Sequence, residues 1–269
     1  MYLDVKTFVR NWKDELRSKI ARMDKAPTLT IIQVGDYPAS TKYVDNKIKD
    51  CKEVGIRPTL YRIPKDSCPT TAQLAQIINQ DESDGLIVQL PVPKGLDVDK
   101  AIHAALTPER DVDGFLPGSF HNPATAQGIR TYLDSLGMGD GTGLLALVIG
   151  RGPLAGKPTA KLLLDRDWTV VQSHSRTNVH TLDEMVAKAD LIVCAVGRAH
   201  FLDASMAKKD AVIIDVGTNW DGNKLVGDVY NGASSDAKVT PVPGGVGLLT
   251  RCALLENVIM AKEIQDENF

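Results

Sequence analysis

The chain has 269 residues, 43% of them apolar, which is enough to bury a substantial core and suits two modest domains better than one. Its formal net charge is −3 with acids and bases interspersed, so no strong field favours nucleic acid or an anionic membrane surface, and we expect a small-molecule partner.

The four cysteines lie far apart, without a C-x-x-C spacing or clustered histidines, which argues against a metal site or a disulfide framework and fits a reducing compartment. The first twenty residues have the pattern of a charged amphipathic helix without an apolar signal core, and no later run approaches membrane-spanning length, so we expect a cytoplasmic protein with no membrane partner.

Strand-like apolar runs alternate with helical patterns along the whole chain. This alternation predicts an α/β fold with largely parallel strands buried on both faces. A stretch rich in glycine, proline and small polar residues, 113–128, separates two groups of strands and is where we place the domain boundary. A glycine-rich turn near the end of the chain precedes a closing helix of some fifteen residues. The expected strands are 28–35, 59–64, 84–91, 144–150, 168–174, 190–197 and 211–217.

A lysine-rich helix is expected over residues 37–56, beginning at Pro38 with a capping Ser40 or Thr41 and ending at Gly55. Its apolar stripe consists of Val44, Ile48 and Cys51. At 3.6 residues per turn, Lys47 lies at the margin of this stripe, one turn after Tyr43. A lysine in that position can simply extend its stem toward solvent, so the helix alone does not decide whether Lys47 is functional.

Two polar features follow predicted strands of the first half, at the edge where open parallel sheets place their ligands. Gln89 interrupts an otherwise apolar strand, where an amide without a partner is costly, so we expect it to be hydrogen-bonded, to backbone or to another side chain. Asp111 and Asp113 precede Gly114, and capping of a turn is the ordinary explanation for such residues.

The second half contains a strand, a tight glycine turn and a helix in succession. Gly150, Gly152 and Gly156 form G-x-G-x-x-x-G, a spaced variant of the dinucleotide fingerprint, in which backbone N–H groups and the helix N-terminus approach a pyrophosphate. Pro158 is compatible with the first turn of the helix that follows.

The loop after the next strand favours NADP over NAD. It contains Ser175 and Arg176 and lacks the acidic residue that usually holds the adenosine ribose. Arg151 and Arg176 could both bind a 2′-phosphate, although both could instead be solvated loop charges, and NAD stays possible.

Six ordered motifs together make the chain resemble the bifunctional methylenetetrahydrofolate dehydrogenase/cyclohydrolase family over nearly its whole length. They are "VGDYPASTKYVDNKIKDCKEVGI", "DGLIVQLPVPKGLD", "PERDVDGF", "VIGRGPLAGKP", "HSRT" and "TPVPGGVG".

The resemblance implies two α/β domains. These are an N-terminal substrate domain, residues 1–117, to which the C-terminal helix 250–269 returns, and a Rossmann-like NAD(P)-binding domain, residues 118–249. It also implies a homodimer. Members of this family work in one-carbon metabolism. They oxidise 5,10-methylenetetrahydrofolate to 5,10-methenyltetrahydrofolate with NADP and hydrolyse that product to 10-formyltetrahydrofolate, so the expected partners are tetrahydrofolate derivatives.

The same resemblance assigns roles to residues at matching motif positions. Lys47 matches the catalytic lysine, Tyr43 the site tyrosine, Gln89 the strand glutamine and Asp113 the aspartate that binds the pterin. The implied folate contacts are Val88, Leu90, Pro243, Gly244, Gly245, Val246 and Gly247, and the implied cofactor contacts are Gly150, Arg151, Gly152, Ser175, Arg176 and Thr218.

Several positions depart from the family pattern. The linker 113–128 is shorter than usual, Gly152 replaces a serine, Thr218 replaces an isoleucine, and Arg110 replaces a lysine at a position expected to be exposed. These changes leave open a member that retains one activity, with the cyclohydrolase kept in preference to the dehydrogenase. Less favoured alternatives are a noncatalytic folate or dinucleotide sensor and a different Rossmann oxidoreductase, which would explain the glycine turn but not Lys47.

Overall fold

The computed structural model describes residues 1–232 and 235–267, and the chain forms two compact units. The first unit contains Asn11–Ala124 together with the part of the chain that follows Thr250. The second unit contains Met1–Arg10 and Thr125–Thr250. The chain thus passes between units after Ala124, where the sequence suggested residue 117, and its first ten residues belong to the second unit.

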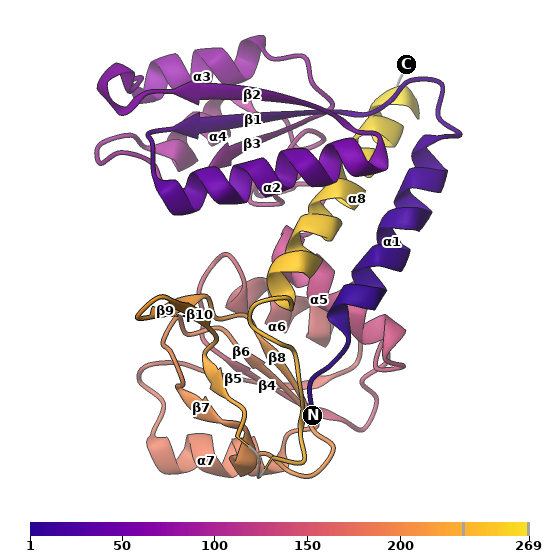
Figure 1. Cartoon of the computed structure of the whole chain (residues 1–269), viewed down its shortest axis with the longest axis vertical. Coiled ribbons are helices and arrows are strands. Elements are labelled where there is room, and N and C mark those ends of the chain that lie inside the picture. The colour runs from indigo at the N-terminus through magenta and orange to yellow at the C-terminus, as the bar shows by residue number, and fades with distance from the viewer. Residues whose placement is uncertain (233–234, 268–269) are drawn as a thin grey trace. The chain divides into compact units, whose positions relative to one another are not determined.

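The first unit is built on a three-stranded parallel sheet in the order β2-β1-β3 (Figure 1). The strands are β1 (Thr28–Val34), β2 (Arg57–Ile63) and β3 (Gly85–Gln89). The central strand β1 is buried along almost its whole length, whereas β2 lies at the edge and is partly exposed. The helices of this unit are α2 (Pro38–Val54), α3 (Thr71–Gln80) and α4 (Val98–Ala105), with a short 3-10 turn at Lys65–Ser67.

Helix α2 begins at Pro38, as expected, but no side chain caps it; its N-cap residue is Tyr37. The predicted capping by Ser40 or Thr41 is therefore wrong, because both residues already lie inside the first turns. Gly55 ends the helix with φ +100°, a left-handed conformation that glycine adopts without steric cost.

The second unit contains a five-stranded parallel sheet in the order β12-β8-β6-β4-β5. Because β4 pairs with β5 on one side and with β6 on the other, the direction of chain winding reverses beside β4. Open α/β sheets bind their ligands at such a switch point, outside the carboxyl ends of the strands. The strands are β4 (Leu145–Ile149), β5 (Thr169–Ser173), β6 (Leu191–Cys194), β8 (Val212–Asp215) and β12 (Lys238–Val239).

Helices and short strand pairs complete the second unit. The helices are α5 (Ala124–Ser135), α6 (Gly156–Leu164) and α7 (Val179–Lys188), with a 3-10 turn at Ala204–Met206. Two small pairs lie outside the main sheet: β7 (Leu202–Asp203) with β11 (Val229–Tyr230), and β9 (Asn219–Asp221) with β10 (Lys224–Val226). Helices α1 (Val5–Ile20) and α8 (Val246–Glu267) each contribute residues to both units.

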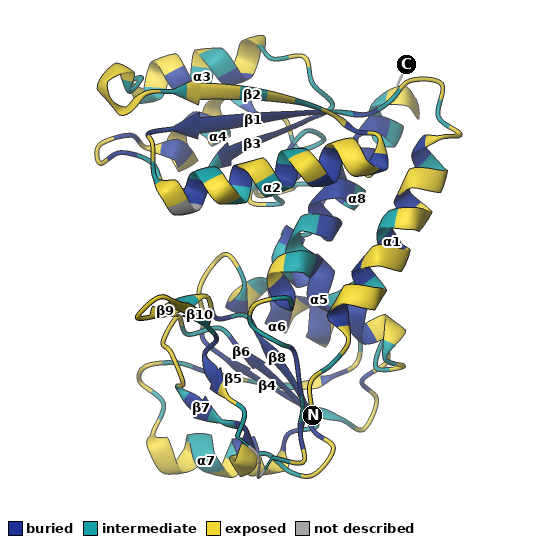
Figure 2. Ribbon diagram, viewed as in Figure 1, coloured by how far each residue is buried: buried dark blue, intermediate teal, exposed yellow. Residues whose placement is uncertain are grey.

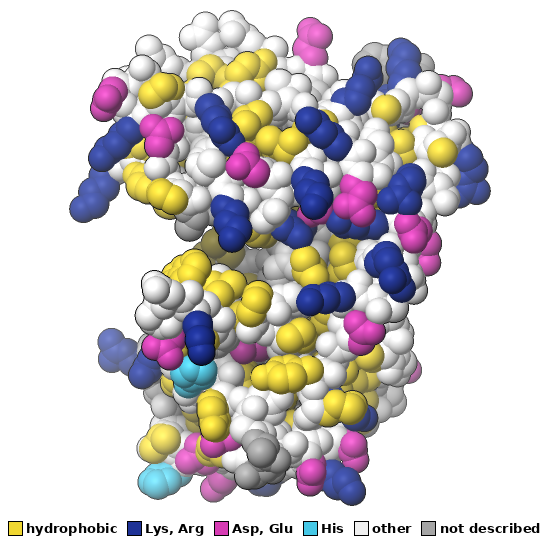
Figure 3. Space-filling model, viewed as in Figure 1, with side chains coloured by type: hydrophobic (Ala, Val, Ile, Leu, Met, Phe, Trp, Pro, Cys, Tyr) yellow, Lys and Arg dark blue, Asp and Glu magenta, His cyan; other side chains and the backbone are white. Residues whose placement is uncertain are grey.

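The seven strands expected from the sequence are all present and parallel, which confirms the α/β fold. Burial on both faces holds for the inner strands but is wrong for β2 and β5, because each is an edge strand with one side unpaired (Figure 2). The closing helix is longer than expected, 22 residues, and begins inside the glycine-rich turn at Val246. Among the described residues, no helix combines the length and the apolar character needed to cross a membrane. Acidic and basic side chains are interspersed over the viewed face (Figure 3).

Candidate active site

The lysine singled out in the sequence is buried in the first unit. Lys47 is 6% exposed, and its Nζ lies 3.0 Å from Oε1 of Gln89, the last residue of β3. The Gln89 Nε2 donates to the Leu90 carbonyl at 2.8 Å, so both ends of the amide are bonded. Gln89 is therefore hydrogen-bonded, as its position in an apolar strand predicted. Its partners are the Lys47 amine and the Leu90 carbonyl.

Tyr43 lies one turn before Lys47 on α2. The Lys47 Nζ is 5.2 Å from the centroid of the Tyr43 ring, within the range of a cation–π contact when the amine is protonated. Burial raises the pKa of the Tyr43 phenol to about 12, so this group stays protonated at neutral pH. Tyr43 therefore offers the site an aromatic face and a hydroxyl donor.

Burial also governs the charge state of the lysine. It lowers the pKa of Lys47 below the ordinary lysine value of 10.5, because the charged form loses hydration. The carboxylate of Asp113 opposes this change in pKa, and the guanidinium of Arg251 adds to it. In turn, burial raises the pKa of Asp113, while Lys47 opposes that change. The site therefore holds an amine that loses its proton more easily than a surface lysine does.

The two aspartates before Gly114 have different surroundings. Asp111 accepts hydrogen bonds from the backbone N–H groups of Gly114, at 3.1 Å, and Leu116, at 2.7 Å. Asp111 is thus a turn-capping residue, as its spacing suggested. Asp113 interacts electrostatically with Lys47, which places it at the same site.

Sequence reasoning missed a buried ion-pair group beside the lysine. Asp50, on the next turn of α2, lies 2.6 Å from the Lys13 Nζ and 2.8 Å from the Arg251 Nε. A charged residue on the buried side of α2 was the available signal for Asp50. Nothing local in the sequence links Arg251 to this helix, because it comes from α8, far along the chain.

Arg110 corrects an expectation. Its side chain is only 13% exposed, pairs with Asp81 at 2.5 Å and donates from Nε to the Ser83 carbonyl at 2.8 Å. The position was expected to be exposed, and it instead joins the loop before β3 to the segment after α4.

The remaining residues implied as folate contacts lie in different units. Val88 is buried in β3, and Leu90, directly after it, is 45% exposed. Pro243–Gly247 belong to the second unit and form the turn in which α8 begins.

The glycine turn of the second unit has the geometry of a dinucleotide-binding loop. Gly150 follows β4 with φ +111°, and a Cβ there would overlap the Ala195 carbonyl oxygen. A Cβ on Gly156 would overlap the Gly150 carbonyl, so α6 packs directly on the turn. Gly152 has no atom within 4 Å of where its Cβ would be, and no side chain caps α6. No side chain competes for the N–H groups at the start of α6, but the Lys157 N–H donates to the Gly152 carbonyl at 3.1 Å and Pro158 has no N–H. The space beside Gly152 is open, as an approach of a pyrophosphate to this turn requires.

The residues implied to bind the adenosine end and the nicotinamide end are exposed. Arg151, Ser175 and Arg176 are solvent-accessible, the first in the glycine turn and the other two after β5. The loop after β5 is held by His174, whose N–H donates to the Thr177 hydroxyl and whose Nδ1 accepts from the Arg176 N–H. Thr218 is also exposed, after β8.

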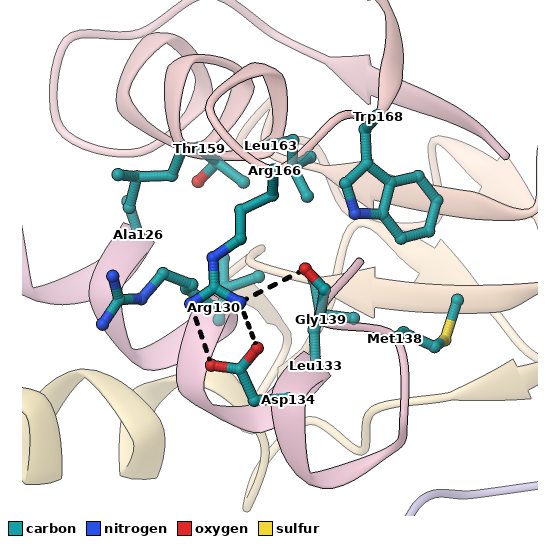
Figure 4. A pocket seen from close by; sticks show the side chains of 12 residues that line it. Ala126, Arg130, Leu133, Asp134, Met138, Gly139, Thr159, Leu163, Arg166 and Trp168 are labelled. Atoms are coloured by element: carbon teal, nitrogen blue, oxygen red, sulfur yellow. Dashed lines mark hydrogen bonds and ion pairs between the residues drawn. The ribbon is translucent and has the colours of Figure 1, made fainter. Parts of the chain in front are cut away.

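A separate cavity between α5 and α6 does not suit a cofactor. It has a volume of about 10 Å³, which is room for a single water at most. Arg166 closes it with hydrogen bonds to Asp134, at 2.6 Å, and to the Gly139 carbonyl, at 3.2 Å (Figure 4).

These two units define a class of protein: a two-part α/β enzyme with a buried lysine–glutamine pair in one unit and a Rossmann-like dinucleotide fold in the other. The chain belongs to the tetrahydrofolate dehydrogenase/cyclohydrolase family. Residues 3–113 match the catalytic domain of that family, and residues 123–266 match its NAD(P)-binding domain. The chain therefore carries both enzyme activities of the family and an NAD(P)-binding domain.

Relatives of known name agree with this assignment. The bifunctional FolD protein of Streptococcus pneumoniae is 40% identical over an alignment of length 279, which covers 96% of this chain and 96% of the relative. That of Acetivibrio thermocellus is 39% identical over 272 residues, covering 94% of this chain and 93% of the relative.

Solved structures share the whole fold. The bifunctional FolD enzyme of Campylobacter jejuni has a TM-score of 0.90 at 34% identity, covering 98% of this chain and 99% of the other. The FolD enzyme of Trypanosoma brucei, in complex with NADP and an inhibitor, has a TM-score of 0.90 at 29% identity, covering 99% of this chain and 98% of the other.

Proposed function

We propose that the chain oxidises 5,10-methylenetetrahydrofolate to 5,10-methenyltetrahydrofolate with NADP and hydrolyses the product to 10-formyltetrahydrofolate, with Lys47 as the proton-transferring group of the hydrolysis. The observation that carries this proposal is the buried amine of Lys47, bonded to Gln89 at 3.0 Å. A binding protein has little use for an amine held in this way. The buried Lys47–Gln89 pair therefore supports a catalytic site.

Lys47 has the properties of a general base. Attack of water on the cationic methenyl carbon forms a carbon–oxygen bond and releases a proton, which needs an acceptor. Because burial lowers the pKa of Lys47, a larger fraction of its amine is neutral and able to accept that proton. The Gln89 carbonyl accepts an N–H from Nζ and so orients the amine.

Substrate binding is assigned to neighbours of the lysine. The carboxyl group of Asp113 can accept hydrogen bonds from a pterin amine and ring N–H. Tyr43 offers a ring face to a flat heterocycle. Val88, Leu90 and the turn Pro243–Gly247 are further folate contacts by the family resemblance.

The second unit has the residues to hold NADP. When bound, the nicotinamide accepts the hydride from the folate methylene group. Gly150, Gly152 and the uncapped start of α6 would bind the pyrophosphate. Arg151, Ser175 and Arg176 would bind the adenosine end, where two arginines and no carboxylate favour a 2′-phosphate. Thr218, in the loop after β8, would lie on the nicotinamide side.

We further propose that the enzyme is a cytoplasmic homodimer. The dispersed cysteines, without a disulfide-like spacing, support the compartment. The dimer rests on the family resemblance, and light scattering on the purified protein tests it.

A spectrophotometric assay tests the catalytic proposal. The protein is given 5,10-methylenetetrahydrofolate with NADP or with NAD, and reduced cofactor is followed. We expect turnover with NADP at a kcat/KM at least about tenfold above that with NAD, since one charged phosphate contact is worth this much. Turnover with NAD alone would overturn the assignment of Arg151 and Arg176. A folded protein that neither reduces NADP nor hydrolyses 5,10-methenyltetrahydrofolate would overturn the proposed function.

A further inference from the structure

In the second unit, the carboxylate of Asp228 accepts four hydrogen bonds. Asp228 is 0% exposed. Its Oδ2 accepts from the N–H groups of Val196, at 2.7 Å, and Gly197, at 2.9 Å, and its Oδ1 accepts from the Arg198 N–H at 2.8 Å. The Asn219 Nδ2 donates to the same Oδ1 at 2.9 Å. Three successive backbone N–H groups thus converge on one side chain, as they do around a bound anion.

A second buried aspartate fixes the first. The Oδ1 of Asp215, at the end of β8, accepts from the Asp228 N–H at 2.9 Å, and its Oδ2 accepts from the Val229 N–H at 3.0 Å. Two glycines make room for these carboxylates, since a Cβ on Gly217 would overlap Asp228 and a Cβ on Gly227 would overlap Asp215. The position of the Asp228 side chain is therefore set by its surroundings.

The loop that Asp228 holds borders the switch point of the sheet. Residues 195–198 directly follow β6, the strand beside β4. The Ala195 N–H donates to the Ile149 carbonyl at 2.8 Å, and the Ala195 carbonyl lies against Gly150, where no Cβ would fit. This loop therefore packs against the glycine turn at the switch point, where open α/β sheets bind their ligands in a crevice. Asn219, the first residue of β9, links the β9–β10 hairpin to the same carboxylate.

We propose that Asp228 is a positioning residue for the dinucleotide: its carboxylate fixes the backbone of residues 196–198 and so sets the shape of the nicotinamide side of the crevice. This inference rests on the proposed function in one respect, because it takes NADP to be the ligand of the second unit. Asp228 itself touches neither cofactor nor substrate. Its effect on catalysis is through the loop alone.

Replacement of the carboxylate by an amide is the sharpest test. Asp228→Asn keeps the size of the side chain but presents an NH₂ group to donors, so at least one backbone N–H loses its acceptor whichever way the amide turns. We expect the Kd for NADP, measured by isothermal titration calorimetry, to rise at least about tenfold, because small displacements of a positioning loop cost one to two orders of magnitude. The KM for NADP should rise by a similar factor. Hydrolysis of 5,10-methenyltetrahydrofolate, which needs no nicotinamide, should change by less than about twofold.

Asp190→Asn is the matched control. Asp190 accepts from the Leu145 N–H at 2.9 Å and pairs with Lys208 at 2.6 Å, at the amino ends of the strands whose carboxyl ends border the crevice. This substitution should also reduce the stability of the second unit, but it should leave the Kd for NADP within about twofold of the wild-type value.

A milder variant covers the case in which Asp228→Asn does not fold. Asn219→Ala removes one donor and keeps all three backbone bonds, so we expect a rise of about threefold in the Kd for NADP. The inference is wrong if folded Asp228→Asn binds NADP as the wild type does, or if Asp190→Asn weakens NADP binding equally. Should Asp228→Asn not fold, unchanged NADP binding by Asn219→Ala would refute it. If the wild type binds NADP but oxidises no folate, the proposed function is wrong. The ratio of the Kd for NADP of Asp228→Asn to that of the wild type then still tests the positioning role of Asp228.

Discussion

At the scale of single residues, the site combines one feature that local sequence predicts with others that it does not. Helical spacing places Lys47 beside Tyr43 at the edge of a buried stripe, and the structure shows the two in contact distance. The amide of Gln89 in an apolar strand predicted a bonded partner, but the identity of that partner depends on the packing of α2 against the sheet. Arg251 was not predictable, because it arrives from a distant helix.

The role of Lys47 as a base predicts different behaviour from a role as a fixed positive charge. Lys47→Met removes the amine, and Lys47→Arg keeps a cation that does not lose its proton in proteins. We expect both variants to lose cyclohydrolase activity by at least about a hundredfold, which is the usual contribution of a general base.

The measurement is the rate of 5,10-methenyltetrahydrofolate hydrolysis, with urea unfolding as the control for folding. Lys47→Met should be at least as stable as the wild type at neutral pH, since it removes the cost of burying an amine. Substantial hydrolysis by Lys47→Arg would show that the residue supplies charge and does not transfer a proton.

At the scale of elements, strands were easier to predict than their surroundings. Apolar runs bounded by turns identify seven of the eight strands in the two parallel sheets, because burial between helices requires such runs, and they miss only the two-residue β12. Which strands lie at the sheet edge depends on pairing order, which the runs do not encode, so the exposure of β2 and β5 was missed. The hairpin β9–β10 and the short pair β7–β11 were missed because strands of two or three residues have no clear alternation.

The end of β8 has a charge that makes the stability of the second unit depend on pH. Burial raises the pKa of Asp215 from 3.8 to about 6, although three backbone N–H groups bind its carboxylate. Because the pKa of Asp215 is higher in the folded protein than in the unfolded chain, protonation of Asp215 stabilises the fold. This stabilisation is fully present below the pKa of the unfolded chain and is lost as the pH rises through about 6.

Comparison with Asp215→Asn isolates this group from the other carboxylates. The stability of the wild type relative to the variant should fall by up to about 3 kcal/mol between pH 4 and pH 7, since a tenfold change in a protonation equilibrium corresponds to about 1.4 kcal/mol. Urea unfolding of both proteins across this range gives the difference. A difference that is constant with pH, or that grows as the pH rises, would contradict the raised pKa of Asp215.

At the scale of the whole molecule, the linear order of the chain hides how the units are assembled. Composition suggested a domain boundary in the stretch 113–128, which is rich in glycine and proline, and α5 begins within that stretch at Ala124. The assignment of the first ten residues to the second unit had no sequence signal. Residues 1–3 make backbone hydrogen bonds to the segment of β12, which side-chain patterns do not report, and the centroid of the Phe8 ring lies 5.1 Å from that of Tyr132.

This assembly predicts that the extreme N-terminus stabilises the dinucleotide fold. The Met1 nitrogen donates to the Ala237 carbonyl, the Val239 N–H donates to the Met1 carbonyl, and the Leu3 N–H donates to the Val239 carbonyl, each at 2.9 Å. Removal of residues 1–3, with Asp4 replaced by the initiating methionine, deletes these three bonds and leaves the edge of β12 unpaired. It also removes the Asp4 carboxylate, which accepts from the Thr7 N–H at 3.1 Å. We expect a loss of about 3–4 kcal/mol in unfolding free energy, at about 1 kcal/mol per bond. Tyr2→Ala is the control, because this side chain is 60% exposed and the substitution keeps every backbone bond. A truncated protein as stable as the wild type, or a Tyr2→Ala variant that loses as much, would show that these backbone bonds do not anchor the sheet.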